Sequence, residues 1–173
     1  MSAARPDRVD VDVLAAGAIC LTRRYPVASL ERLADVLASP EGEVEATFEF
    51  ERLGEGLAGC RLDVSAAVRL RCQRCLEAFE QPLRSRAQLA FVGSDEEAGR
   101  VPEGCEAVPA DDGRADLREL VEDELLLSLP IVALHGGDTR CAASSRQAVE
   151  GKAEEPAAET HRPFAQLQEL LKH

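Results

Sequence analysis

Two alternating apolar segments flank a Cys-x-x-Cys motif near the middle of the chain. The first places apolar residues at even positions from Cys60 to Cys72, and the second places them at odd positions from Phe79 to Phe91. A period of two is typical of β-strands with one buried face. Because the connection between the segments is short, the sequence predicts a long β-hairpin with Cys72 and Cys75 at or near its tip.

The positions between these apolar residues are rich in arginine. Residues 61–86 contain six arginines against three acidic residues, although the whole chain has a net charge of -12. One interpretation is a solvated surface whose arginines pair with acids on a neighbouring strand. The other is a ridge that contacts RNA phosphates without reading the bases. The candidate RNA-binding residues are Arg69, Arg71, Arg74, Arg84 and Arg86.

Shorter patterns surround the hairpin. Residues 43–51 alternate strictly and predict a strand, and the valines at 9, 11 and 13 predict an edge strand. Residues 29–38 have helical spacing, with Ser29 placed as the N-cap. A second helix is predicted to begin at Asp116 and to end before Pro130.

These patterns predict one α+β domain over residues 1–135, built on a strongly curved antiparallel β-sheet with two flanking helices. Closure of this sheet into a barrel-like form is one option. Residues 136–161 are polar, rich in alanine and glutamate and without a period, which predicts a disordered acidic linker. Residues 162–173 contain a short apolar pattern and predict a C-terminal helix that must dock on another surface to be stable.

The sequence also argues against several classes of protein. No apolar run approaches the ~20 residues that span a bilayer, and the first residues lack the apolar core of an export signal. Cys60 falls at a buried strand position, where a free thiol is common, so a reducing cytoplasm is the expected compartment. The three histidines lie outside the periodic elements, and there is no glycine-rich phosphate loop. We therefore expect no enzymatic activity, no small-molecule substrate and no membrane partner.

Three segments of the sequence have the order and spacing seen in a known family. They are RLRCQRCLEAF at residues 69–79, DLRELVEDELLLSLPI at 116–131 and RPFA at 162–165. Together they resemble the YceD family, whose members are called large ribosomal RNA subunit accumulation proteins. The resemblance implies a non-catalytic ribosome biogenesis factor that promotes the synthesis, processing or accumulation of the large-subunit ribosomal RNA. Its implied partners are that RNA or a pre-ribosomal particle.

The Cys-x-x-Cys motif has three interpretations. Two cysteines at this spacing supply half of a tetrahedral zinc site, and many relatives resemble a fuller pattern with several cysteines after the Leu-Pro. This chain has a histidine and one cysteine there, so the candidate metal ligands are Cys72, Cys75, His135 and Cys141. The favoured interpretation is two reduced structural thiols without a bound cofactor. A thioredoxin-like redox role is disfavoured because that motif begins a helix in a βαβ unit.

The acidic residues suggest a different class of partner. Residues 93–173 contain 8 basic and 18 acidic residues, a net charge of -10. Acids at 95–97, at 111–112 and on an exposed helix face at 119–124 would suit an acidic chaperone or adaptor for a basic ribosomal protein. The competing interpretation is ordinary helix capping and solubility. A zinc-binding interaction module is the remaining alternative.

Overall fold

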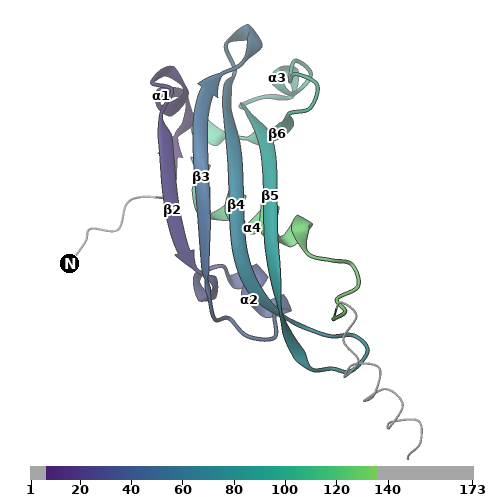
Figure 1. Cartoon of the computed structure of the whole chain (residues 1–173). Coiled ribbons are helices and arrows are strands. Elements are labelled where there is room, and N and C mark those ends of the chain that lie inside the picture. Colours follow the sequence, from purple (N-terminus) through teal and green to yellow (C-terminus); the bar gives the residue numbers. More distant parts are fainter. Residues whose placement is uncertain (1–6, 136–173) are drawn as a thin grey trace, which may run out of the picture. The chain divides into compact units, whose positions relative to one another are not determined.

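The computed structural model describes residues 7–135, with the exception of the side chain of Glu55. A five-stranded sheet has the strand order β2-β3-β4-β5-β6 (Figure 1). Its strands are β2 (Cys20–Pro26), β3 (Glu43–Arg52), β4 (Ala58–Arg71), β5 (Ala78–Val92) and β6 (Glu106–Pro109). Neighbouring strands are antiparallel, except that β5 and β6 are parallel. Together with its helices, this sheet confirms the predicted α+β class.

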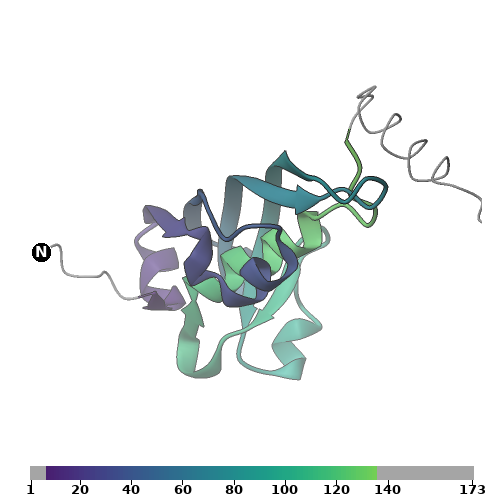
Figure 2. The same cartoon turned by 90° about the horizontal axis from the view of Figure 1, so that it is seen from below.

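The sheet is open, so the barrel-like option is wrong. β2 and β6 lie at opposite edges and do not pair with each other within residues 7–135. Helices cover the apolar face instead of further strands: α1 (Val11–Ala16) contacts β3 and β4, and α4 (Leu117–Ser128) contacts β4 and β5. Figure 2 shows α4 and α2 (Glu31–Val36) together on one side of the sheet. Because this face is already covered, closing the sheet would bury little further apolar surface.

Strands β4 and β5 form the predicted hairpin. Their register places Cys60 opposite Leu89 and Leu70 opposite Phe79. Residues opposite each other in an antiparallel pair point to the same face, so the even positions of β4 and the odd positions of β5 share the apolar face. Leu70 and Leu89 are only 5% and 4% exposed. The core between this face and the helices includes Phe48, Leu62, Leu33, Leu117 and Leu125.

The helix predicted over residues 29–38 is shorter than expected and has a different cap. Residues Val27–Ser29 form a 3-10 helix, η1, and α2 begins only at Glu31. The Ser29 hydroxyl donates to the Pro26 carbonyl at 2.7 Å instead of capping α2. The cap comes from Glu122 in α4, whose Oε1 accepts from the backbone N–H of Leu33 at 3.1 Å. Glu122 is 7% exposed, which corrects its assignment to an exposed helix face.

The N-terminal valines do not form one strand. β1 (Arg8–Asp10) pairs with β7 (Arg114–Asp116) as a separate two-stranded sheet. The next residue already begins α1, because the Asp10 carboxylate accepts from the backbone N–H of Val13 at 3.0 Å and caps the helix. Asp116 caps α4 in the same way and accepts from Arg118 at 2.9 Å, as the sequence predicts.

The remaining elements are short. They are α3 (Asp95–Ala98) and the 3-10 helices η2 (Gly54–Gly56) and η3 (Asp111–Gly113). β6 pairs only with Leu89–Val92 of β5. Within residues 7–135, the rest of this edge of β5, which includes Pro82, therefore has no neighbouring strand. None of the helices in this part of the chain has the length and apolar character needed to cross a membrane. The predicted linker and C-terminal helix, at 136–161 and 162–173, lie outside the described residues.

Candidate functional site

The connection between β4 and β5 folds into a tight turn that carries both cysteines of the motif. The backbone N–H of Leu76 donates to the Cys72 carbonyl at 2.9 Å, and the N–H of Cys72 donates to the Glu77 carbonyl, also at 2.9 Å. Leu76 has a φ of 64°, in the left-handed region that closes the turn. These bonds fix the positions of both cysteines at the end of the hairpin, which we call the hairpin tip (residues 69–80).

A third chemical group reaches the hairpin tip from the end of α4. The chain after α4 returns to the tip, where the backbone N–H of Gln73 donates to the Ala133 carbonyl at 2.9 Å. His135 follows, and its ring lies against Phe79 with 4.8 Å between the ring centroids. Its Nδ1 lies 3.5 Å from the Sγ of Cys75. A histidine that lies 60 residues away in the sequence is therefore held next to the cysteine pair.

The donor atoms of Cys72, Cys75 and His135 all lie within 4.8 Å of one another. Ligands of a tetrahedral zinc ion, at about 2.0–2.3 Å from the metal, are roughly 3.3–3.8 Å apart. A small movement of the side chains would therefore bring all three into coordination distance. The fourth candidate ligand, Cys141, lies outside the described residues. Thiolate and imidazole are the donors that zinc prefers, so these three residues fit a metal ion of this kind.

The buried thiols of Cys60 in β4 and Cys72 in the turn differ in their acidity. Burial raises the pKa of the Cys60 thiol to about 12, as expected for an inert core residue. Burial also acts to raise the pKa of Cys72, but hydrogen bonds from the backbone N–H groups of Cys75, His135 and Arg74 outweigh it and lower this pKa to about 6. The thiolate is the form of cysteine that binds metals. The turn therefore stabilises at Cys72 the charge that a metal ion requires.

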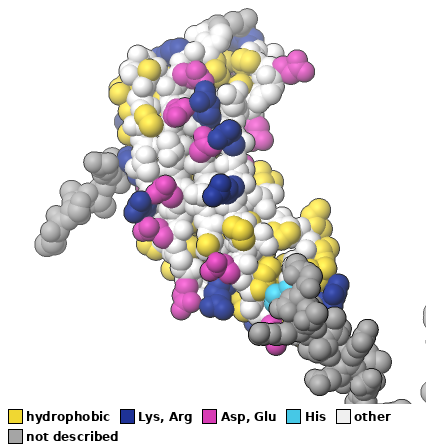
Figure 3. All heavy atoms as spheres, in the orientation of Figure 1, with side chains coloured by type: hydrophobic (Ala, Val, Ile, Leu, Met, Phe, Trp, Pro, Cys, Tyr) yellow, Lys and Arg dark blue, Asp and Glu magenta, His cyan; other side chains and the backbone are white. Residues whose placement is uncertain are grey.

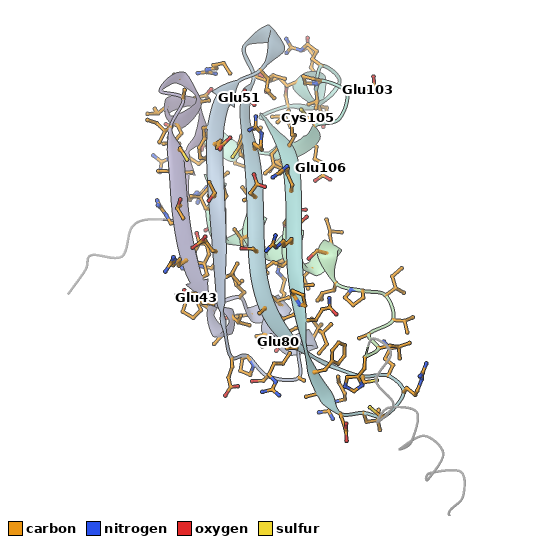
Figure 4. The ribbon with its side chains drawn as sticks, viewed as in Figure 1. Glu43, Glu51, Glu80, Glu103, Cys105 and Glu106 are labelled. Carbon is orange, nitrogen blue, oxygen red and sulfur yellow. The ribbon has the colours of Figure 1, made fainter. Side chains whose placement is uncertain are left out.

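On the face of the sheet opposite the helices, ion pairs neutralise several of the arginines. The Nε of Arg86 lies 2.6 Å from Asp63, and the Nη1 of Arg61 lies 2.8 Å from Glu49. β3 contributes further acids along its length, and Figure 4 labels Glu43 and Glu51 at its two ends. A hollow of about 430 Å³ on this face is lined by acids and arginines together. The middle of the face therefore gives little attraction for a polyanion.

The arginines nearer the hairpin tip have fewer acidic partners. In the part of the chain that the structure describes, Arg69, Arg74 and Arg84 form no ion pair with a carboxylate. Arg71 donates from Nη1 to the Leu76 carbonyl at 3.0 Å and forms no ion pair with a carboxylate within residues 7–135. Glu80 is opposite Arg69 in the register and lies where β5 approaches the tip (Figure 4). Among the five candidate arginines, Arg86 is the one that pairs with an acid within residues 7–135, so the structure distinguishes it from the other four.

The sequence interpretation missed an apolar surface beside these arginines. Ile131 is 96% exposed, Leu76 64% and Val132 55%. The hydrogen bond between Gln73 and Ala133 places residues 131–134 next to the tip. Figure 3 shows hydrophobic side chains gathered at the end of the molecule where the histidine is coloured cyan. The signal in the sequence was the run of apolar residues after Pro130, which lies beyond the end of the amphipathic helix.

The sequence alone fixed no histidine as a catalytic partner of Cys75, but the structure places His135 beside it. A cysteine and a histidine at this distance resemble the nucleophile and base of cysteine hydrolases. Such an enzyme needs backbone donors directed at a substrate oxyanion. Here the backbone N–H groups of the turn are directed at the sulfur of Cys72 instead. The arrangement therefore suits coordination of a cation better than acyl transfer.

Comparison with known proteins connects this chain to one family. The family described as "Large ribosomal RNA subunit accumulation protein YceD" matches residues 60–171, from the start of the hairpin through α4 and beyond. A protein of Haemophilus influenzae with the same description is 33% identical over 147 residues, which are 84% of this chain and 84% of that relative. No solved structure matches the chain.

Proposed function

The chain belongs to the YceD family, and from this premise we propose that it promotes accumulation of the large-subunit ribosomal RNA by binding that RNA, or a precursor particle, in the cytoplasm. The hairpin tip and the neighbouring part of β5 would provide the contact surface. Binding would be non-catalytic, with the protein acting as an assembly factor. The candidate contacts remain Arg69, Arg71, Arg74, Arg84 and Arg86.

The observation that carries this proposal is the distribution of ion pairs. Arg69, Arg74 and Arg84 are exposed and have no carboxylate partner within residues 7–135. A guanidinium without a partner can bind a phosphate without first breaking an ion pair. Arg86 would have to exchange Asp63 for a phosphate, so we expect it to contribute least. Phosphate contacts of this kind position an RNA but carry no sequence information.

Neutralising the free arginines tests the proposal. We expect the double variant Arg69→Gln, Arg74→Gln to bind ribosomal RNA more weakly, and the slope of log affinity against log salt to become shallower by about 1.4. The matched control is Arg24→Gln, Arg61→Gln, which removes the same charge from arginines that pair with Glu45 and Glu49 on the same face. Equal losses in both variants, or no loss in the first, would contradict a contact surface at the tip.

A structural metal site is a second function that the geometry favours. Cys72, Cys75 and His135 would hold a zinc ion, which would join the hairpin to the segment after α4 and stabilise the tip. We expect zinc in protein purified without chelator, measured by elemental analysis, and its loss in a Cys75→Ser variant. Cys20→Ser is the control, because Cys20 is an exposed thiol on an edge strand. A metal content that is unchanged in Cys75→Ser would contradict this site.

The acidic adaptor has less support from the contacts of α4. Glu122 and Asp123 both bind Arg32, at 2.9 and 2.6 Å. Glu124 accepts from the Ser85 hydroxyl. These acids are therefore occupied within the fold and are less available to a basic protein. A pulldown with and without ribonuclease separates the two ideas, because partners that bind through RNA are lost after digestion.

A further inference from the structure

Leu76 occupies a backbone conformation that its side chain does not favour. Its φ of 64° lies in the left-handed region, where glycine and asparagine are usual and a branched apolar residue is strained. The backbone is held there by the bond from its N–H to the Cys72 carbonyl and by the bond from Arg71 to its own carbonyl. The turn requires a positive φ at this position, which glycine or asparagine would adopt with less strain than leucine.

The side chain of Leu76 makes too few buried contacts within the fold to offset this strain. It belongs to a residue that is 64% exposed, next to a segment in which Ile131, Val132 and Leu134 are 96%, 55% and 38% exposed. We call these four residues the apolar tip patch. Exposed apolar side chains that gather in one place usually mark a surface that another molecule covers. The strained leucine and the exposed neighbours are independent signs of such a contact.

The charges around the apolar tip patch limit what can cover it. Arg71 at the end of β4 and Arg74 in the turn both precede Leu76, and Arg69 lies two residues earlier in β4. Glu77 and Glu80 offset part of this charge, so residues 69–80 carry a net charge of +1. This combination suits a molecule that carries both negative charge and flat apolar faces. Duplex RNA presents mainly phosphates and hydroxyl groups, because its bases are stacked. Unpaired nucleotides present phosphates and exposed base faces together.

We propose that the apolar tip patch binds unpaired nucleotides of RNA, with base faces against Leu76 and its neighbours and phosphates on the adjacent arginines. This inference rests on the proposed function, since it names the form of RNA that the tip selects. Leu76 would act like the apolar side chains that contact unstacked bases in other nucleic-acid complexes. Ile131, Val132 and Leu134 come from the segment after α4, so this segment and the hairpin build the surface jointly.

The test uses the full-length chain and two labelled probes, a mixed-sequence single strand of about 12 nucleotides and a blunt duplex of the same length. Fluorescence anisotropy measures both affinities for the wild type, for Leu76→Gly and for the control Val36→Ser, whose valine is 56% exposed on α2. Glycine accepts a positive φ, so Leu76→Gly should keep the thermal stability of the wild type. We expect it to lose about 10-fold in affinity for the single strand, with the duplex unchanged.

The possible results separate this inference from the proposed function. No binding of either probe by a wild type that still binds ribosomal RNA overturns this inference alone, and loss of ribosomal RNA binding as well overturns both. Binding of both probes with equal affinity, unchanged in Leu76→Gly, overturns only the preference for unpaired nucleotides. Capture of a ribonuclease-resistant protein partner that Leu76→Gly abolishes would assign the apolar tip patch to a protein and also overturn it. A selective loss for the single strand, absent in Val36→Ser, supports it.

Discussion

Replacing Glu122 with alanine tests how α2 and α4 are joined. The carboxylate accepts from the backbone N–H of Leu33 at 3.1 Å and from the Nε of Arg32 at 2.9 Å. Losing a helix cap costs about 1 kcal/mol, and leaving a buried N–H without a partner raises this to about 2 kcal/mol. The Arg32 side chain is 52% exposed, so its pair adds only about 0.5 kcal/mol after solvent screening. With the buried methylene of the side chain, the total is about 3 kcal/mol.

Urea unfolding followed by circular dichroism measures this loss. A slope of about 1–3 kcal/mol per molar urea converts 3 kcal/mol into a midpoint lower by roughly 1–3 M. Glu122→Gln keeps an oxygen that can cap α2, so it should cost about 1 kcal/mol. Asp123→Ala removes an exposed partner of the same arginine and should cost about 0.5 kcal/mol. If Glu122→Ala were as stable as Asp123→Ala, the capping role would be refuted.

Three further results are expected. Burial, together with nearby Asp7, raises the pKa of Tyr25 well above 10.0. The phenolate absorbance of this single tyrosine should therefore appear at higher pH in the native state than in urea. The contribution of Tyr25 to the free energy of unfolding is complete below pH 10.0 and is lost as pH rises. The lowered pKa of Cys72, about 6 against an ordinary 9.0, stabilises the metal-free fold above pH 9.0, and this contribution should be lost as pH falls towards 6, except in Cys72→Ser. Leu62→Ala, at a fully buried position, should cost about 2–5 kcal/mol in urea unfolding, against less than about 0.5 kcal/mol for Val13→Ala at a residue that is 65% exposed.

The hairpin could be predicted because most of the positions on one of its faces are buried. A period of two then appears directly in the sequence, and Leu70 and Leu89 are buried as that period indicates. β2 could not be found in this way because Arg23 occupies an inward position between Leu21 and Tyr25 and interrupts the apolar alternation. Strand pairing with β3, rather than side-chain pattern, determines this edge.

The candidate site was only partly predictable for a similar reason. His135 could be named as a ligand because it follows the Leu-Pro, but only the bond from Gln73 to Ala133 places it beside Cys75. The different roles of Arg84 and Arg86 depend on which residue lies opposite each one. Register places Asp63 opposite Arg86 and Ser65 opposite Arg84. Contacts of this kind join residues far apart in the sequence, and no local pattern records them.

The short pairing between β5 and β6 has a consequence for self-association. An open strand edge can act as a template on which further copies of a chain polymerise into fibrils. Pro82 lies in the open part of β5 and supplies no amide hydrogen, which interrupts any such template. When the β5 edges of two copies meet, most alignments place the arginines at 84 and 86 of one copy close to those of the other. Their like charges then repel each other. The open part of β5 is therefore protected against edge-to-edge pairing between copies of the chain.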